Sequence, residues 1–144
     1  SKIELMELCG WGIQVFRKNI PEKIMVDLIG IGAGVHDRLK EQGYPVVGVN
    51  AAESPCSKSE DFKNKKAEMY WHLRGLFERQ EIIIPKIPHH NKLIAELSAM
   101  KYKYDSSGKL QIVDPEKSPD FADALALACY GPIISARVPG VVMF

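Results

Sequence analysis

Two short apolar runs, joined by a glycine-rich turn and a helical segment, constrain the fold of this chain most strongly. Lys23–Ile29 (KIMVDLI) is rich in branched residues and has the form of a strand buried on both faces of a sheet. Glycines at positions 30, 32 and 34 make a turn, Val35–Gln42 has a helical pattern, and Tyr44–Val49 (YPVVGV) follows as a second strand. This order predicts a βαβ unit with a parallel strand pair inside an α/β sheet.

Helical and strand patterns continue along the rest of the chain. Ile3–Lys18 and Phe62–Gln80 place apolar residues at helical spacing, and the polar composition of residues 51–60 predicts an exposed loop. The other predicted elements are a short strand at Glu81–Ile84, a helix at His89–Ser98, a hairpin of Met100–Tyr104 and Lys109–Val113 around Asp105–Gly108, and a helix at Ser118–Tyr130 with Ser118 as its N-cap and Pro119 in its first position.

The composition is that of one globular domain, which we expect to span residues 1–144. Of the 144 residues, 46% are hydrophobic, and the net charge of +1 excludes a uniformly basic nucleic-acid coat protein and an acidic disordered tail. Cys9, Cys56 and Cys129 are widely spaced, which argues against a disulfide framework or a zinc–thiolate site and fits a reducing cytoplasm. No apolar run reaches the roughly 18 residues of a membrane span, and a signal-peptide pattern is lacking. We therefore expect a cytoplasmic protein with no membrane partner.

The clearest chemical signal lies in the sequence SPDFADALAL at the start of the last predicted helix. Asp120 and Asp123 are three residues apart, so they share one face of the first helical turn. Two carboxylates placed in this way repel each other unless a positive charge lies beside them, and Mg²⁺ or Mn²⁺ is a suitable partner for carboxylate oxygens. The alternative is that both carboxylates only favour the helix dipole at a solvated first turn.

Asp27 favours the metal interpretation because it interrupts an apolar strand. A carboxylate in such a strand is costly unless it is paired or faces an open site near the strand's end. If this strand and the last helix are neighbours, Asp27, Asp120 and Asp123 form a cluster of oxygen ligands. Two metal ions about 4 Å apart in such a cluster could activate water and neutralise the leaving oxygen in phosphodiester cleavage.

The same residues carry a resemblance to a known family. The segments VDLIGIGAGVHDRL (Val26–Leu39), PVVGVN (Pro45–Asn50), NKKAEMYWHL (Asn64–Leu73) and SPDFADALALA (Ser118–Ala128), in this order, resemble the C-terminal nuclease domain of tailed-phage terminase large subunits, the DNA-packaging motors. The resemblance implies an α/β, RNase H-like nuclease core with a central mixed sheet flanked by helices. It also implies Asp27 as the acid after the central strand, Asp123 as a metal ligand on the closing helix, and Asp120 as its partner one turn earlier.

From this resemblance we expect an endonuclease domain that cleaves concatemeric double-stranded DNA by two-metal phosphodiester hydrolysis with Mg²⁺ or Mn²⁺. Expected partners are the DNA, an ATPase domain, other terminase subunits and the portal, in the cytoplasm of a host cell that carries the phage or prophage. Members of this fold usually begin with three antiparallel strands that supply a further acid, and no strand pattern precedes Lys23. A phosphate-binding Gly-x-x-x-x-Gly-Lys loop is absent as well. We therefore expect an N-terminally truncated domain that is weakly active or inactive alone.

Basic residues beside the predicted loop are candidates for contact with DNA. Lys58, Lys63, Lys65 and Lys66 cluster there and could guide the phosphate backbone. The alternative is a solvated helix face on which Glu60, Asp61 and Glu68 offset the charge.

Other functions remain open at the level of sequence. One is a nuclease like the Holliday-junction resolvases, which share the Asp-x-x-Asp-Ala-Leu pattern of the closing helix. Another is a noncatalytic α/β module that binds a nucleotide or another subunit. The glycine run at 30–34 resembles a dinucleotide-binding turn, but its third glycine comes one residue early and no acidic strand end follows. The apolar segment 131–144 could be a tail that docks on this chain or on a partner.

Overall fold

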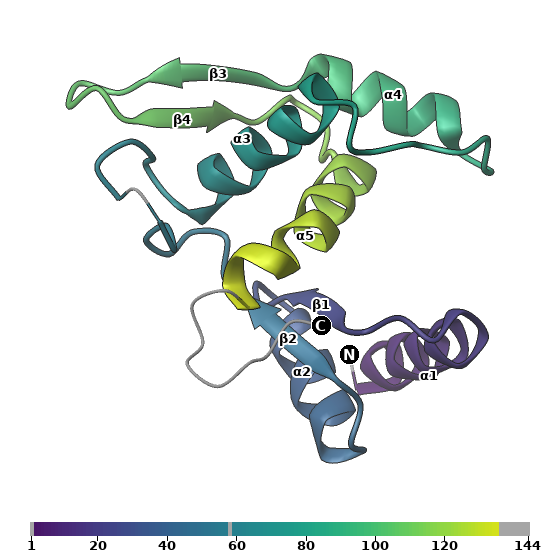
Figure 1. The fold of residues 1–144 in the computed structure, drawn as a ribbon. Coiled ribbons are helices and arrows are strands. Elements are labelled where there is room, and N and C mark those ends of the chain that lie inside the picture. Colours follow the sequence, from purple (N-terminus) through teal and green to yellow (C-terminus); the bar gives the residue numbers. More distant parts are fainter. Residues whose placement is uncertain (1, 58, 136–144) are drawn as a thin grey trace. The chain divides into compact units, whose positions relative to one another are not determined.

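The computed structural model describes residues 2–57 and 59–135, which divide into two compact units, one that ends at Ala51 and one that begins at Ala52 (Figure 1). The first unit contains helix α1 (Lys2–Asn19), strand β1 (Ile24–Asp27), helix α2 (Gly32–Glu41) and strand β2 (Val46–Val49). The second contains α3 (Lys65–Glu78), α4 (His90–Ala99), β3 (Lys101–Tyr104), β4 (Leu110–Val113) and α5 (Asp120–Ser135). The single domain predicted over residues 1–144 stays a prediction, and the segment 136–144 of the predicted tail lies outside the described residues.

The first unit is the βαβ unit that the sequence predicts. Strands β1 and β2 pair in parallel, with Ile24 opposite Val46 and Asp27 opposite Val49. Helices α1 and α2 pack together, and their buried Cys9, Val35 and Leu39 form a core with side chains of the two strands. This packing confirms the predicted helices around the parallel pair.

The side chains of β1 alternate between two faces of the strand, one packed against the core and the other carrying Asp27. Ile24 and Val26 pack against the core formed with α1 and α2. Because successive side chains of a strand point to opposite faces, Met25 and Asp27 project from the other face. Asp27 is the last residue of β1 and is exposed. The strand therefore presents one carboxylate at its carboxyl end, on the face opposite its helices.

Two glycines leave room for close contacts around this strand end, Gly32 with backbone and Gly48 with a side chain. A Cβ atom at Gly32 would lie 1.6 Å from the carbonyl oxygen of Asp27, and one at Gly48 would lie 2.5 Å from Cδ2 of Leu28. Any side chain at position 32 must therefore push the start of α2 away from the end of β1. The predicted glycine-rich turn is thus needed for helix–strand packing.

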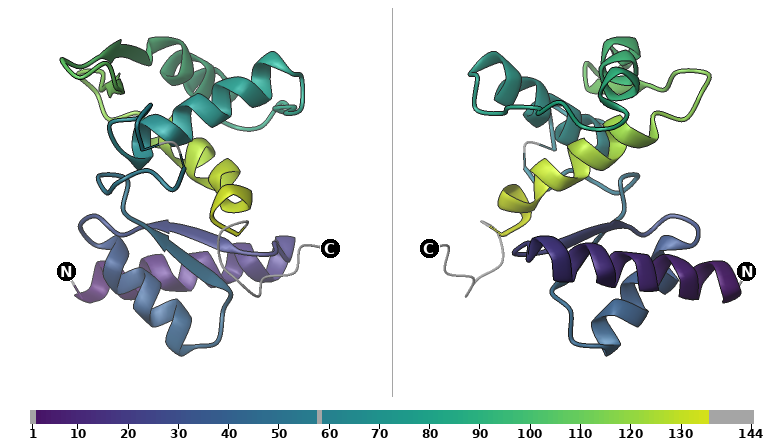
Figure 2. Two further views of the ribbon diagram at one scale, coloured as in Figure 1. Left: turned by 60° about the vertical axis from the view of Figure 1, so that its left-hand side comes forward. Right: turned by 90° about the vertical axis from the view of Figure 1, so that its right-hand side faces the viewer.

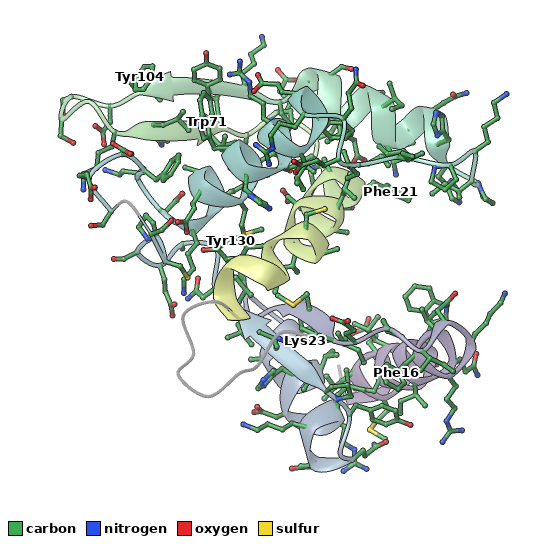
Figure 3. The ribbon with its side chains drawn as sticks, viewed as in Figure 1. Phe16, Lys23, Trp71, Tyr104, Phe121 and Tyr130 are labelled. Carbon is green, nitrogen blue, oxygen red and sulfur yellow. The ribbon has the colours of Figure 1, made fainter. Side chains whose placement is uncertain are left out.

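The second unit is built around α3. The β3–β4 hairpin lies on one side of α3 and α5 on the other, as Figure 1 and the left view of Figure 2 show. Trp71 extends from α3 towards the hairpin (Figure 3), where its ring meets Tyr102 edge to face with centroids 5.4 Å apart.

The β3–β4 hairpin is antiparallel, with Tyr104 opposite Leu110, as predicted. Asp105 Oδ1 accepts hydrogen bonds from the backbone N–H groups of Ser107 and Lys109, and these bonds stabilise the turn between the two strands.

The strand predicted at Glu81–Ile84 is wrong. Within the described residues, this segment has no strand partner and no regular structure. Ile83 is 89% exposed, so its branched side chain lacks the neighbouring strand that would bury it. Short apolar runs become strands only where another strand is available to pair with them. The other predicted elements are confirmed, with ends that shift by a few residues.

In the part of the chain that the structure describes, none of the helices is both long and apolar enough to span a membrane.

The close approach at Gly32 gives the first prediction. Gly32→Ala should lower the free energy of unfolding by about 1–3 kcal/mol, because the new methyl group overlaps backbone atoms that cannot move independently. Gly10→Ala is the control, since nothing lies within 4 Å of a Cβ atom at that helical position. It should be neutral or stabilise the protein by up to about 1 kcal/mol. Urea unfolding measures both changes, and a Gly32→Ala protein as stable as the parent would contradict the packing argument.

Candidate metal-binding site on helix α5

The start of α5 is fixed by a carboxylate from another helix. Glu96 on α4 accepts hydrogen bonds from the backbone N–H groups of Phe121 (2.7 Å) and Ala122 (3.0 Å) through its Oε2 atom. These are unpaired donors of the first helical turn, and a negative charge there also complements the helix dipole. Glu96 therefore holds the turn that carries the two candidate metal ligands.

The predicted N-cap, Ser118, is wrong for a local reason. The carbonyl of Pro119 accepts the first helical bond, from the N–H of Asp123 at 2.8 Å, so Ser118 lies one residue too early to cap. Its hydroxyl instead donates to Oδ1 of Asp120 at 2.5 Å. Asp120 itself is exposed.

Asp123 is held from the side of α3. The buried hydroxyl of Tyr70 donates to Oδ1 of Asp123 at 2.6 Å, and the ammonium group of Lys66 lies 3.5 Å from the same oxygen. Burial raises the pKa of Tyr70 far above its ordinary value, and the hydrogen bond to Asp123 and the charge of Asp123 raise it further. The phenol therefore stays protonated and acts as a donor. Since both contacts use Oδ1, Oδ2 can accept another ligand.

Lys66 bridges two carboxylates. Its Nζ atom lies 2.5 Å from Oδ1 of Asp114, which directly follows β4, and 3.5 Å from Asp123. The Lys66 side chain is 20% exposed and that of Asp123 is 41% exposed. One positive charge thus offsets two negative charges in a partly solvated setting.

Asp27 belongs to the other unit and is oriented by its own strand end. The backbone N–H of Ile29 donates to Oδ1 of Asp27 at 3.0 Å, while the N–H of Leu28 continues the parallel pairing to Val49. The carboxylate is thereby positioned by local backbone and remains open to solvent. The structure describes each unit by itself, so the predicted meeting of Asp27 with Asp120 and Asp123 stays a prediction.

The donor set has the chemistry that a hard divalent cation needs. Asp27, Asp120 and Asp123 offer only carboxylate oxygens, the ligands preferred by Mg²⁺ and Mn²⁺. Within each unit, the described residues contain no group of three or more His, Cys, Asp or Glu side chains able to hold an ion. Magnesium is commonly bound by one or two carboxylates, with water completing the shell. Asp120 and Asp123 are therefore suited to contribute part of a site.

The predicted DNA-binding lysines have carboxylate partners inside the second unit. Lys63 lies 3.4 Å from Asp105, Lys65 lies 2.6 Å from Glu53, and Lys66 pairs with Asp114 as described above. Of these three side chains, Lys63 is the most exposed, at 52%. Lys58 lies outside the described residues.

The sequence interpretation missed a buried carboxylate. Glu68 is only 3% exposed, although charge pattern alone suggested a solvated helix face. It accepts hydrogen bonds from the N–H groups of Cys56 (2.8 Å) and Ser57 (2.7 Å), from the Ser57 hydroxyl, and from the hydroxyl of Tyr130 at 2.5 Å. Burial alone would raise the pKa of Glu68, but the hydrogen bonds outweigh it and lower the pKa. Only its position three residues after the start of α3 hinted at this role, by facing the preceding loop.

Glu68 and Tyr70 form a reciprocal pair of contacts with α5. Tyr130, on the later part of α5 (Figure 3), donates to Glu68 of α3, and Tyr70 of α3 donates to Asp123 on the early part of α5. The chain runs in opposite directions along the two helices (Figure 1). Ala122 and Ala126 are fully buried on α5, and such small residues allow helices to approach closely. The site carboxylate is therefore part of a packed helix pair.

Comparisons with known proteins identify the fold. No protein-family model matches the sequence, and no curated protein matches it significantly. Among solved structures, the nuclease domain of the large terminase subunit gp2 of bacterial virus Sf6, solved with manganese, matches with a TM-score of 0.71 at 20% identity, over 84% of this chain and 71% of that chain. The magnesium-bound large terminase nuclease from thermophilic phage G20c matches with a TM-score of 0.54 at 20% identity, over 76% of this chain and 52% of that one.

These matches define the fold of the chain as α/β. More particularly, the chain has the fold of the nuclease domains of phage large terminase subunits, which confirms the fold class and the resemblance predicted from the sequence. One detail differs from the prediction: within the described residues the strands form two separate sheets, the parallel pair β1–β2 and the antiparallel hairpin β3–β4, and not one central mixed sheet.

The Glu68 network gives the second prediction. Glu68→Gln should lower the free energy of unfolding at neutral pH by about 2 kcal/mol, because the amide cannot accept all of the hydrogen bonds made to the carboxylate. The pKa of Glu68 is lower in the folded state than its ordinary value of 4.5, so its ionised carboxylate stabilises the folded protein at pH values above 4.5. This stabilisation is lost as the pH falls through the lowered pKa. The difference between the two proteins should therefore shrink below pH 4.5.

Urea unfolding from pH 7 to pH 3 measures this difference. Glu60→Gln is the matched control, since Glu60 is exposed and it should change stability little at any pH. A Glu68→Gln difference that stays constant down to pH 3 would contradict the role of the ionised carboxylate.

Proposed function

We propose that this chain is the metal-dependent DNA endonuclease domain of a phage DNA-packaging terminase. Its substrate is concatemeric double-stranded DNA, and its cofactors are two Mg²⁺ or Mn²⁺ ions. The observation that carries the proposal is that Asp123, the ligand expected from the sequence, is held by Tyr70 and Lys66 on a fold shared with nuclease domains solved with manganese or magnesium. If the carboxylate of Asp123 only stabilised the helix dipole, it would need no contacts from a neighbouring helix.

Each residue of the site has a task that follows from its surroundings. Asp123 supplies Oδ2 as a ligand oxygen while Tyr70 retains Oδ1. Asp120 offers an exposed carboxylate one turn earlier, and Asp27 supplies a carboxylate oriented by the backbone of β1. Bound divalent ions would supply activation of water and neutralisation of charge on the phosphate. The protein's part is to fix these oxygens and to admit the DNA backbone.

The wider assembly follows from the same proposal. In a packaging motor, the nuclease domain works with an ATPase domain, other terminase subunits and the portal, in the cytoplasm of the infected or lysogenic host. The cut would follow the position of the motor, so we expect little sequence preference.

Metal linkage and DNA cleavage test the proposal together. Mn²⁺ should raise the melting temperature of this chain, because an ion that binds only the folded state stabilises it. Asp123→Asn should abolish the shift and, in a plasmid-nicking assay on the longest available form of the protein, should lower the rate by more than about 100-fold.

Glu116→Gln is the control for this experiment, since Glu116 is an exposed carboxylate just before α5 and should leave both readouts unchanged. Equal nicking rates for Asp123→Asn and the parent would remove Asp123 from the mechanism. Preferential cleavage of four-way junctions over linear duplex would favour the resolvase-like alternative.

We also propose that Lys58, Lys63, Lys65 and Lys66 guide the DNA backbone, with Lys63 as the strongest contributor, because it is about half exposed and its partner Asp105 is 3.4 Å away. Lys63→Ala should weaken duplex binding for all sequences and reduce the slope of log affinity against log salt by about 1. Lys86→Ala, an exposed lysine of the segment between α3 and α4, is the control. Fluorescence anisotropy at several salt concentrations measures the slope, and an unchanged slope for Lys63→Ala would contradict this contact.

A further inference from the structure

The face of α3 turned towards α5 carries two side chains that contact Asp123 and differ in charge. Lys66 and Tyr70 are four residues apart, so they lie on one helical face, and both approach Oδ1 of Asp123. They approach it with different chemistry. Tyr70 brings a neutral hydrogen-bond donor, and Lys66 brings a positive charge.

Tyr70 is built to be a fixed donor. The residue is only 7% exposed, and its neighbours on α3, Ala67 and Met69, are also buried. A phenol with two rotatable bonds, packed in this way, can offer its O–H in few directions, and the 2.6 Å hydrogen bond ends on one carboxylate oxygen. The consequence is a set orientation of the Asp123 carboxylate.

Lys66 is placed between two acidic groups, at unequal distances. Its ammonium group lies 2.5 Å from Asp114 and 3.5 Å from Asp123. The nearer carboxylate, Asp114, is exposed, with a side chain that is 62% accessible, and it follows β4 rather than lying on α5. Asp114 therefore keeps most of the contact with the lysine, while Asp123 feels its charge at longer range.

We propose that Tyr70 and Lys66 are positioning residues for Asp123 with opposite effects on a bound divalent ion. Tyr70 favours the ion, because it holds Oδ1 and leaves Oδ2 oriented for coordination. Lys66 opposes the ion, because its positive charge balances Asp123 when no cation is present, and Asp114 limits that opposition by drawing the ammonium group away. The metal role of this arrangement rests on the proposed function.

Tyr70 and Lys66 are expected to change Mn²⁺ affinity in opposite directions. One binding measurement therefore distinguishes these roles from a general loss of structure, which could only weaken binding. Mn²⁺ affinity can be measured by electron paramagnetic resonance of free Mn²⁺ in titrations of the chain. Tyr70→Phe should weaken Mn²⁺ binding about 10-fold or more, as loss of a partner that orients a ligand does. Lys66→Met should tighten binding by roughly 10-fold, because a nearby like charge is removed. Asp114→Asn should weaken it, because Lys66 is then free to pair with Asp123.

Matched controls keep this test specific. Tyr102→Phe removes a phenol from the β3 strand, on the hairpin side of α3, and Lys66→Arg retains the charge; both should bind Mn²⁺ like the parent. Thermal melts without metal report whether each variant folds, and tightening by Lys66→Met cannot arise from misfolding.

The outcomes distinguish the two proposals. If the parent binds Mn²⁺ and Asp123→Asn does not, but Tyr70→Phe and Lys66→Met both match the parent, the positioning roles are wrong and the metal site stands. If Lys66→Met weakens binding, the opposing role of Lys66 is wrong. If neither the parent nor any variant binds Mn²⁺ at millimolar concentration, both the positioning roles and the proposed metal site are overturned.

Discussion

The packing of α3 against α5 is the constraint on which the account depends. Each helix gives a phenol to a carboxylate of the other, Tyr70 to Asp123 and Tyr130 to Glu68. A carboxylate that is fully buried, like Glu68, or partly buried, like Asp123, loses solvation in the folded state, so each pair stabilises the helix packing only while both partners are present. The same contacts that hold the second unit together therefore decide where Asp123 points. Stability and the candidate site share one set of hydrogen bonds.

Three carboxylates in this unit serve different purposes because their surroundings differ. Glu68 is buried and saturated with donors, so it anchors the loop before α3. Glu96 caps α5 from α4 and fixes the turn that bears Asp120 and Asp123. Asp123 is partly exposed and has one oxygen engaged by Tyr70. Asp123 has an unengaged oxygen and lies one turn from the exposed Asp120, whereas Glu68 is buried and Glu96 is engaged by two backbone N–H groups of α5.

The sequence predicts those features that depend on residues near one another in the chain. The apolar runs KIMVDLI and YPVVGV, joined by a glycine-rich turn and a helical segment, predict the parallel strand pair. The turn residues at Asp105–Gly108 predict the hairpin. Asp123 can be proposed as a ligand from the sequence because its spacing to Asp120 is local. Glu68, Tyr70 and Glu96 could not be assigned in this way, because their partners lie 11 to 62 residues away. The strand predicted at Glu81–Ile84 fails for the same reason, since no partner strand lies beside it.

The most direct test of the central claim is paramagnetic broadening of the protein's NMR signals by traces of Mn²⁺. The claim is that Asp27, from the first unit, and Asp120 and Asp123, from the second, hold the same divalent ions. The account predicts that the backbone signals of Asp27 and Asp123 weaken together, at the same low Mn²⁺ concentration, and that Asp123→Asn suppresses both effects. Broadening confined to Asp120 and Asp123, with Asp27 unaffected, would contradict a shared metal site.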